Sequence, residues 1–281
     1  MRTLSVTLIT QTVKTLFMEA NVDIGSSMLS ALQRHLSTEA SPLGQSVLSQ
    51  IIENDQVAKT KRMPICQDTG MSVVFVKLGQ NVHLVDGDLN EAIHEGVRQA
   101  YREGYLRKSV VSDPLFDRLN TKDNTPAVIH VDIVPGEQVE LEVMPKGFGS
   151  ENMSALKLFA PSMGIEGIKR FILETIRNAG PNACPPMIVG IGIGGTFELA
   201  ALLAKKAVLR STDHPSSDAR YAQLERDLLG EANALGLGPA GLGGTTTALA
   251  INIEFYPTHI ASIPVAINIS CHASRHAKAV V

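Results

Sequence analysis

The sequence PICQDTG at residues 64–70 lies between two stretches that favour different secondary structures. Residues 5–60 carry apolar side chains at helical spacing, whereas residues 71–78 are β-branched and aromatic enough for a strand. The segment between them sets a thiol beside an amide, a carboxylate and a hydroxyl. Any fold of this chain must therefore hold a chemically reactive turn where a helical region meets a sheet.

The stretches around this turn predict an α/β fold. Residues 1–62 are expected to form an N-terminal helical lobe. Residues 128–134 and 139–143 alternate apolar and polar side chains around a Pro-Gly pair, which predicts a β-hairpin and, with it, further strands. We therefore expect mixed sheets flanked by helices, in one catalytic domain that covers residues 1–281.

Residue types mark several element boundaries. Ser41 followed by Pro42 has the pattern of an N-cap and a first helical residue. Asp88 and Glu91 stand in the spacing of a capping box and predict a helix over 88–102. Further along the chain, the patterns predict a buried strand and three more helices, over residues 186–192 and over 165–178, 197–209 and 219–235.

Composition limits the classes of function. The net charge of −3 gives no general attraction to nucleic acid or anionic membranes, and no basic stretch with interleaved aromatic residues occurs. No segment approaches the ~20 apolar residues of a membrane span, and residues 1–13 lack the uninterrupted apolar region of a signal peptide. Three cysteines cannot all pair within one chain, so we expect reduced thiols in the cytoplasm.

The three cysteines, Cys66, Cys184 and Cys271, lie far apart in the sequence, so only the fold can bring them together. Each lies beside proline, glycine or polar residues that indicate a turn. The plainer alternative is that each is a small buried apolar residue. Three thiolates would suit a [4Fe-4S] cluster with one iron left open, and an open iron can act as a Lewis acid toward a hydroxyl or carboxylate.

Two glycine-rich segments resemble nucleotide-binding motifs. GIGIGG at residues 190–195 has dinucleotide-binding spacing, but no later strand ends in the required acidic residue. Tight packing of a strand on a helix, or backbone N–H groups facing an anion, are alternatives. GPAGLGGT at residues 238–245 has the spacing of a phosphate loop, yet Gly244 occupies the lysine position, so a flexible loop is favoured.

Three polar side chains are candidates for acid/base work or substrate binding. Asp68 adjoins Cys66 closely enough to act as a base near a metal, or it caps the following turn. Arg107 could bind a carboxylate through two hydrogen bonds, or it is solvated. His259 enters a long apolar run, where burial would hold it neutral, as a core residue or as an acid/base partner.

A different metal site is also compatible with the sequence. His272 and His276 lie four residues apart and could share a helical face, so with Cys271 they could bind zinc in a hydrolase. Surface or capping roles for these histidines are the plainer alternative. From another class, the chain could be a non-catalytic scaffold subunit that holds no cluster.

Five motifs in order carry a resemblance to a known family. They are PICQDTG at 64–70, YLRKS at 105–109, KGFGSEN at 146–152, CPP at 184–186 and SCHA at 270–273. Together they resemble the class I (iron–sulfur) fumarase and L-tartrate dehydratase family, most closely the α subunit of its two-subunit forms, which is equivalent to the N-terminal domain of its single-chain forms. The resemblance covers nearly the whole chain.

The resemblance implies a role for each matching residue. Cys66, Cys184 and Cys271 would hold a [4Fe-4S] cluster, and Asp68 would act in catalysis, paired with His259. The expected substrate-binding residues are Gln67, Arg107, Gly149 and Ser150. The implied reaction is reversible addition or removal of water on a four-carbon dicarboxylate, either fumarate/malate or L-tartrate/oxaloacetate.

The resemblance also implies a partner. The chain stops at Val281, ten residues after Cys271, so it has no counterpart of the family's C-terminal domain. We therefore expect a β subunit to complete the site, in an α2β2 assembly or around an α dimer.

Overall fold

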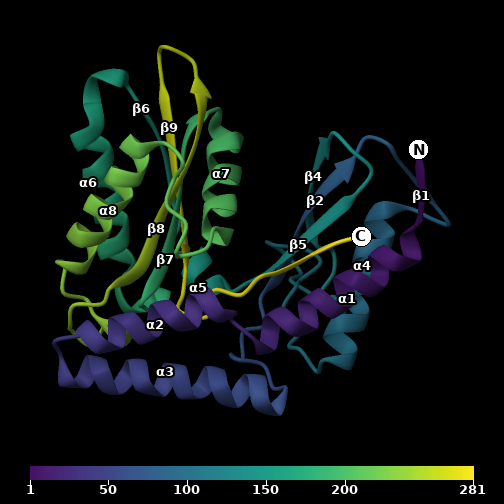
Figure 1. The fold of residues 1–281 in the computed structure, drawn as a ribbon, viewed down its shortest axis with the longest axis horizontal. Coiled ribbons are helices and arrows are strands. Elements are labelled where there is room, and N and C mark those ends of the chain that lie inside the picture. Colours follow the sequence, from purple (N-terminus) through teal and green to yellow (C-terminus); the bar gives the residue numbers. More distant parts are fainter. The chain divides into compact units, whose positions relative to one another are not determined.

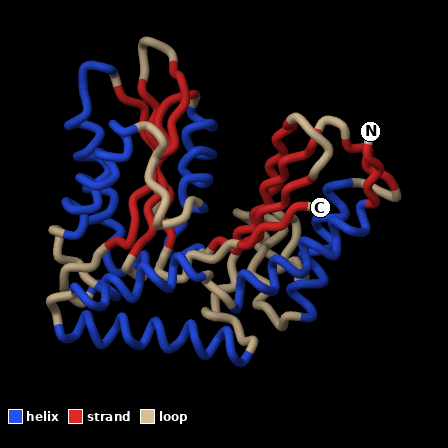
Figure 2. Tube along the Cα trace, viewed as in Figure 1, coloured by secondary structure: helices blue, strands red, loops and turns tan.

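The computed structural model describes all residues from 1 to 281 (Figure 1). Contacts divide the chain into two compact units. The first unit comprises residues 1–24, 55–148 and 275–281, and the second comprises residues 25–54 and 149–274. Each unit contains a four-stranded sheet with helices packed on it, and the first also contains a two-stranded sheet (Figure 2). The expected α/β class, with mixed sheets flanked by helices, is confirmed.

The first unit is built on a mixed sheet in the order β10-β5-β2-β4. Strand β2 runs parallel to β4 and antiparallel to β5. Apolar side chains of α1 and α4, including Phe17 and Ile93, pack against Val74 and Leu141 of the sheet. The elements of this unit are β1 (Arg2–Ser5), α1 (Val6–Val22), β2 (Met71–Gly79), β3 (Val82–Val85), α4 (Leu89–Glu103), β4 (Val128–Val134), β5 (Val139–Lys146) and β10 (Ala277–Val280).

The predicted β-hairpin is wrong. Strands β4 and β5 form where the alternation placed them, but β2 lies between them and pairs with both. Residues 73–76 of β2 are buried in succession, which suits a central strand. The connection from β4 to β5 passes the end of β2, where Gly79 N donates to Gln138 O at 2.9 Å. The alternation of apolar and polar side chains identified the two strands. It could not distinguish two strands that pair with each other from two strands that flank a third.

The second unit is built on a sheet in the order β6-β9-β7-β8. Strands β7 and β8 are parallel, and β9 is antiparallel to β7 and to β6. Helix α7 covers one face, while α6 and α8 cover the other (Figure 1). The elements are α2 (Ser26–Thr38), β6 (Ala155–Phe159), α6 (Gly164–Ala179), β7 (Met187–Gly195), α7 (Phe197–Leu209), α8 (Ala219–Asn233), β8 (Ala248–Thr258) and β9 (Ile263–Ser270), together with residues 42–54 of α3 (Pro42–Lys61) and residues 149–151 of α5 (Phe148–Glu151).

The glycines of residues 190–195 serve strand–helix packing. A Cβ on Gly190 would lie 2.2 Å from the carbonyl oxygen of Ala204, and one on Gly192 would lie 2.0 Å from that of Ala200. Both distances are far below van der Waals contact, so only glycine lets α7 approach β7 this closely. The packing alternative to a dinucleotide site is therefore confirmed.

The N-terminal helices lie where the sequence predicted them. Ser41 Oγ accepts Gly44 N at 3.1 Å as α3 begins at Pro42. The three helices do not form one packing unit, however, because α1 packs on the sheet of the first unit, while α2 and residues 42–54 of α3 belong to the second. A single catalytic domain over 1–281 stays a prediction. None of the helices is both long and apolar enough to cross a membrane.

Helix α3 carries a buried carboxylate that predicts a pH-dependent stability. Asp55 is 5% exposed and neither carboxylate oxygen has a hydrogen-bond partner. Burial, and to a smaller extent the charge of Asp23, raise the pKa of Asp55 to about 7. Because the folded-state pKa is raised, the folded chain loses stability as pH rises from the unfolded pKa through the folded one.

We therefore expect Asp55→Asn to stabilise the chain at pH 8 relative to wild type. The gain in unfolding free energy should shrink toward pH 4, a change of up to about 4 kcal/mol from the pKa difference. Chemical denaturation at both pH values measures it, with Asp117→Asn at an exposed position as control. An unfolding free energy of Asp55→Asn that follows wild type at both pH values would contradict the prediction.

Candidate active site

The PICQDTG segment forms a compact turn that leads into β2. Asp68 N donates to Cys66 Sγ at 3.4 Å, and Asp68 Oδ1 accepts Gly70 N at 3.0 Å. Gly70 has φ +79, and a Cβ there would lie 2.6 Å from the backbone of Pro145, so glycine is required. Cys66 and Asp68 are half-buried and Gln67 is exposed. The thiol, the amide and the carboxylate therefore lie together, within reach of a ligand.

The Asp68 carboxylate is fixed from two sides. Besides Gly70 N, it accepts Phe148 N through Oδ2 at 2.9 Å. Residues 146–148, the first part of the KGFGSEN segment, thus lie directly beside the PICQDTG turn, although the two are far apart in the sequence. The capping role is observed, and because a carboxylate has about four acceptor positions, it leaves acceptor capacity for a further proton or hydrogen bond.

Arg107 lies beside the same turn. Thr69 Oγ1 donates to the backbone oxygen of Arg107 at 3.0 Å, and the Arg107 side chain is exposed. Tyr101, fully buried in α4, donates its hydroxyl to the oxygens of Thr69 and Gly70 at 2.7 and 2.9 Å. Burial raises the pKa of Tyr101 to about 12, so it stays a neutral donor. We call Cys66, Gln67, Asp68 and Arg107 the first half-site.

Cys184 and Cys271 lie together at one end of the second unit's sheet. Strands β7 and β9 pair antiparallel, with Ile188 opposite Ser270. The residues before β7 and the residues after β9 therefore lie at the same end of the sheet. His272 N donates to Cys184 O at 3.3 Å. Cys184 is exposed in a left-handed conformation, with φ 51 and ψ 64, and Cys271 is half-buried.

The substrate-binding candidates Gly149 and Ser150 belong to α5 of the same unit. A Cβ on Gly149 would lie 3.6 Å from the backbone oxygen of Asn182, two residues before Cys184. The glycine loop 238–245 is also close, since Ala240 N donates to Pro185 O at 2.8 Å. Gly243 N of the loop also donates to Leu237 O at 2.8 Å. We call Gly149, Ser150, Cys184 and Cys271 the second half-site.

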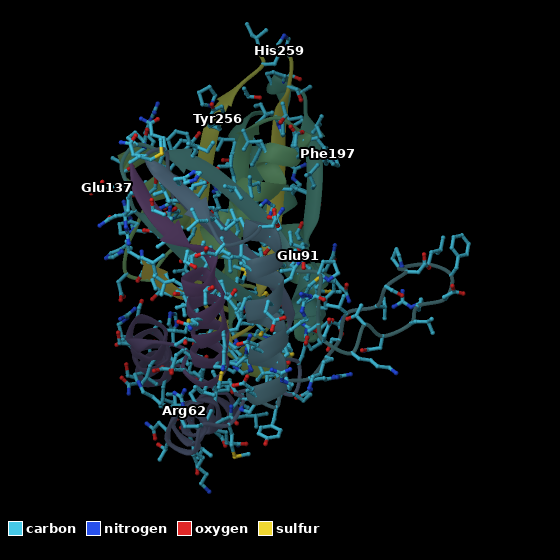
Figure 3. The ribbon with its side chains drawn as sticks, turned by 90° about the vertical axis from the view of Figure 1, so that its right-hand side faces the viewer. Arg62, Glu91, Glu137, Phe197, Tyr256 and His259 are labelled. Atoms are coloured by element: carbon cyan, nitrogen blue, oxygen red, sulfur yellow. The ribbon has the colours of Figure 1, made fainter.

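His259 does not join the second half-site. It lies exposed at the tip of the loop that connects β8 to β9 (Figure 3), and the eight residues of β9 separate this tip from Cys271, a span of about 26 Å. The expectation of a buried neutral histidine is wrong, because the apolar run becomes buried only from Pro264 onward. An acid/base role for His259 stays a prediction.

The structure removes the basis of the zinc hypothesis. Residues 271–276 are not helical, so His272 and His276 do not share a helical face. They also belong to different units. Neither unit by itself gathers three or more His, Cys, Asp or Glu side chains that could hold a metal. None of the three cysteines is in a disulfide, and one lies on the first unit and two on the second.

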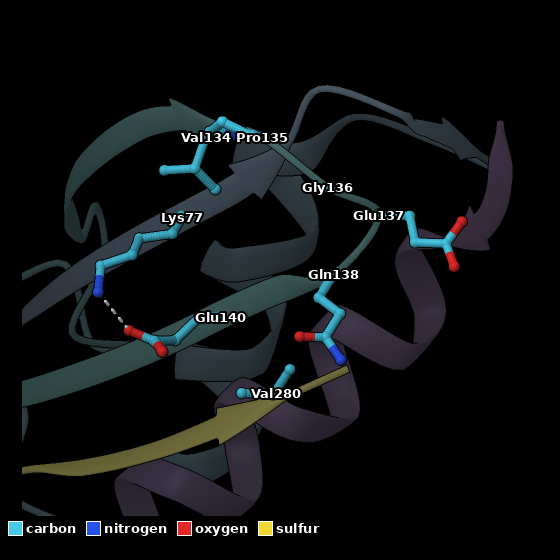
Figure 4. Close-up of a pocket in the computed structure, with 8 residues that line it drawn as sticks. All are labelled: Lys77, Val134, Pro135, Gly136, Glu137, Gln138, Glu140 and Val280. Atoms are coloured by element: carbon cyan, nitrogen blue, oxygen red, sulfur yellow. Dashed lines mark ion pairs between the residues drawn. The ribbon is translucent and has the colours of Figure 1, made fainter.

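A pocket of about 330 Å³ lies at the other end of β2, away from the PICQDTG turn (Figure 4). Residues 134–138, Lys77, Glu140 and Val280 line it. Lys77 Nζ and Glu140 Oε1 form an ion pair at 2.8 Å there, which satisfies the charged groups. The pocket contains none of the predicted site residues.

Sequence reasoning missed the buried polar residues behind the first half-site. Arg275 is 3% exposed, and its Nη2 donates to Asp68 O at 2.7 Å. Asn21 is fully buried and accepts Arg275 Nη1 at 3.2 Å. The only sequence signal is a polar residue placed next to apolar segments, and that signal does not name a partner.

Comparison with known proteins identifies the family of the chain. Residues 10–280 match the family model described as fumarate hydratase (Fumerase). A putative L(+)-tartrate dehydratase subunit alpha from Methanocaldococcus jannaschii is 44% identical over 273 residues, which cover 96% of each chain. The L(+)-tartrate dehydratase subunit alpha from Escherichia coli is 36% identical over 248 residues, covering 87% of this chain and 81% of the relative. The chain therefore belongs to the fumarate hydratase family, whose members are hydro-lyases.

Proposed function

We propose that this chain is the α subunit of a [4Fe-4S]-dependent hydro-lyase that reversibly adds water to, or removes it from, a four-carbon dicarboxylate. The observation that carries the proposal is the placement of Cys184 beside Cys271 at one sheet end, with the third thiol, Cys66, in a turn that also holds Asp68. Both turns are accessible. A plain structural role would favour buried thiols.

The donor set fits an iron–sulfur cluster. The three cysteines are the soft ligands that iron–sulfur clusters use, and none of them is in a disulfide. When bound by three thiolates, such a cluster supplies an open iron that acts as a Lewis acid toward a substrate hydroxyl. Cys66 belongs to the first unit, and Cys184 and Cys271 belong to the second.

The remaining residues of the half-sites would bind and orient the substrate. The exposed guanidinium of Arg107 can donate two parallel hydrogen bonds to one substrate carboxylate. The exposed amide of Gln67 can donate to a further oxygen. Gly149 and Ser150, next to the turn before Cys184, would line the pocket. Holding both carboxylates in place would supply part of the rate through orientation.

Asp68 would transfer the proton. A proton beside a carboxylate is weakly acidic, so its removal needs a positioned base. Hydrogen bonds from Gly70 N and Phe148 N fix the Asp68 carboxylate and leave acceptor positions on it. His259 is kept as a proposed partner of Asp68; it is an exposed residue of the second unit, whereas Asp68 belongs to the first.

The substrate and the partner are proposed from the relatives. The two relatives are named subunit alpha of an L(+)-tartrate dehydratase, and the family is named for fumarate hydratase. We propose L-tartrate/oxaloacetate and fumarate/malate as the candidate pairs, which differ by one hydroxyl. We also propose a β subunit that completes the site, in an α2β2 assembly or around an α dimer.

The cluster assignment predicts a specific loss of iron. After anaerobic purification and reconstitution, the chain should hold about four iron and four acid-labile sulfide. Each of Cys66→Ala, Cys184→Ala and Cys271→Ala should lose most of both, because three thiolates are the minimum for this cluster. The control is Ser46→Ala at an exposed position on α3, with circular dichroism on every variant. Full sulfide content in any cysteine variant would remove that residue from the ligand set.

The proposed carboxylate contact predicts a binding defect. Arg107→Ala, assayed with the β subunit, should raise KM for the dicarboxylate about 100-fold or more, since it loses two hydrogen bonds to a charged group that contribute about 1.5–3 kcal/mol each. Steady-state kinetics against Arg102→Ala, a 71% exposed arginine side chain on α4, provides the matched comparison. An Arg107→Ala enzyme with the KM of the Arg102→Ala enzyme would show that Arg107 is only a solvated side chain.

A further inference from the structure

Arg275 is an unusual residue to bury behind an active-site turn. Its side chain is 3% exposed, and a buried charge is costly unless it is well bonded. Its hydrogen bonds go to neutral acceptors, the backbone oxygen of Asp68 at 2.7 Å and the side-chain oxygen of Asn21 at 3.2 Å. Its Nε has no partner. Burying the Arg275 charge costs free energy, and this cost beside the turn at residues 65–68 indicates that the position of this turn is important.

Asn21 holds the other end of the same turn. Its backbone oxygen, at the end of α1, accepts Ile65 N at 2.9 Å. Its side chain is itself fixed, because Asn21 Nδ2 donates to Phe17 O at 2.9 Å. Residues 65–68 are therefore attached to α1 twice, directly at Ile65 and through Arg275 at Asp68.

The same contacts lie next to the proposed chemistry. Cys66 and Asp68 both fall in the attached segment, and Arg275 follows Cys271 by four residues in the sequence. At Gly147, a Cβ would lie 3.4 Å from Asp68 Oδ2 and 3.8 Å from Arg275 Nη2, so the carboxylate and the guanidinium both border this glycine. A loss of Arg275 would therefore act first on the geometry of Asp68 and Cys66.

We propose that Arg275 is a positioning residue that, with Asn21, clamps both ends of residues 65–68 and so fixes the Cys66 thiol and the Asp68 carboxylate for the reaction. The Asn21–Arg275 clamp acts through Asp68 and does not touch the substrate. The catalytic part of this inference rests on the proposed function, whereas the clamping of the turn does not.

The clamp is tested first on the chain without cluster or substrate. Arg275→Met keeps the apolar stem and removes both hydrogen bonds, so residues 64–70 should exchange amide hydrogens at least about tenfold faster and Cys66 should alkylate correspondingly faster. Arg275→Lys, which retains the charge and can reach one acceptor, should show a smaller change. Asn21→Ser keeps the backbone contact to Ile65, so its effect should be confined to the Asp68 end and is readable if Arg275→Met does not fold.

The second part uses the reconstituted enzyme with its β subunit. Arg275→Met should lower kcat about 10- to 100-fold, because a small misplacement of reacting groups has effects of this size. The KM should stay within about twofold, with partial recovery of kcat in Arg275→Lys. With kcat expressed per bound cluster, a residue that only stabilises the fold would lower the amount of loaded enzyme and leave this kcat unchanged.

The matched control is Arg210→Met in the second unit. Arg210 is also a mostly buried arginine whose Nε lacks a partner, and it bonds Glu225, Glu254 and Ile253 O, none of which belongs to either half-site. Its loss should lower the melting temperature but leave kcat and the exchange of residues 64–70 unchanged.

Amide exchange and Cys66 alkylation at wild-type rates in Arg275→Met would overturn the clamp. Faster exchange without any fall in kcat would overturn only the positioning role, and absence of hydro-lyase activity in wild type would overturn the proposed function and leave the clamp result standing.

Discussion

The antiparallel pairing of β7 with β9 is the constraint on which the second half-site depends. Setting Ile188 opposite Ser270 fixes where the chain enters β7 and leaves β9, and Cys184 and Cys271 lie just outside those two points. A register slip of one residue would turn every side chain of β9 to the other face, which the buried apolar faces of this sheet do not allow. The core of the second unit therefore holds the two cysteines together.

The first half-site is built in the same way. Strand β2 begins at Met71, opposite Lys146 at the end of the antiparallel strand β5. The PICQDTG turn enters β2 at this point and the KGFGSEN segment leaves β5, so that Asp68 can accept Phe148 N. In both units, reactive residues lie where a central strand begins beside the end of its antiparallel neighbour. Strand ends combine a rigid base with exposed backbone and side-chain groups, which suits them to binding.

The sequence predicted those parts of the structure that local patterns determine. The turn at 64–70, the capping of α4 by Asp88 and the helix that begins at Pro42 follow from residue type and spacing, and all are observed. The insertion of β2 between β4 and β5 was missed because alternation is a property of one strand, whereas pairing order depends on burial in the whole sheet.

For the candidate site, too, local sequence patterns predicted one part, and only the tertiary structure revealed the rest. The motifs named the members of both half-sites, but the division between two units and the exposed position of His259 are tertiary facts. Arg275 and Asn21 could not be found from the sequence, because they are separated by most of the chain and only the fold brings them into hydrogen-bond contact with each other and with Asp68.

The central proposal is that Cys66, Cys184 and Cys271 together hold one cluster. It is tested most directly by alkylating each cysteine with a mass-tagged reagent, without oxygen, before and after cluster reconstitution. The account predicts that Cys66, Cys184 and Cys271 all react in the chain without cluster and that all three become protected together, in proportion to the sulfide incorporated. Protection of Cys184 and Cys271 with Cys66 still fully reactive would contradict it.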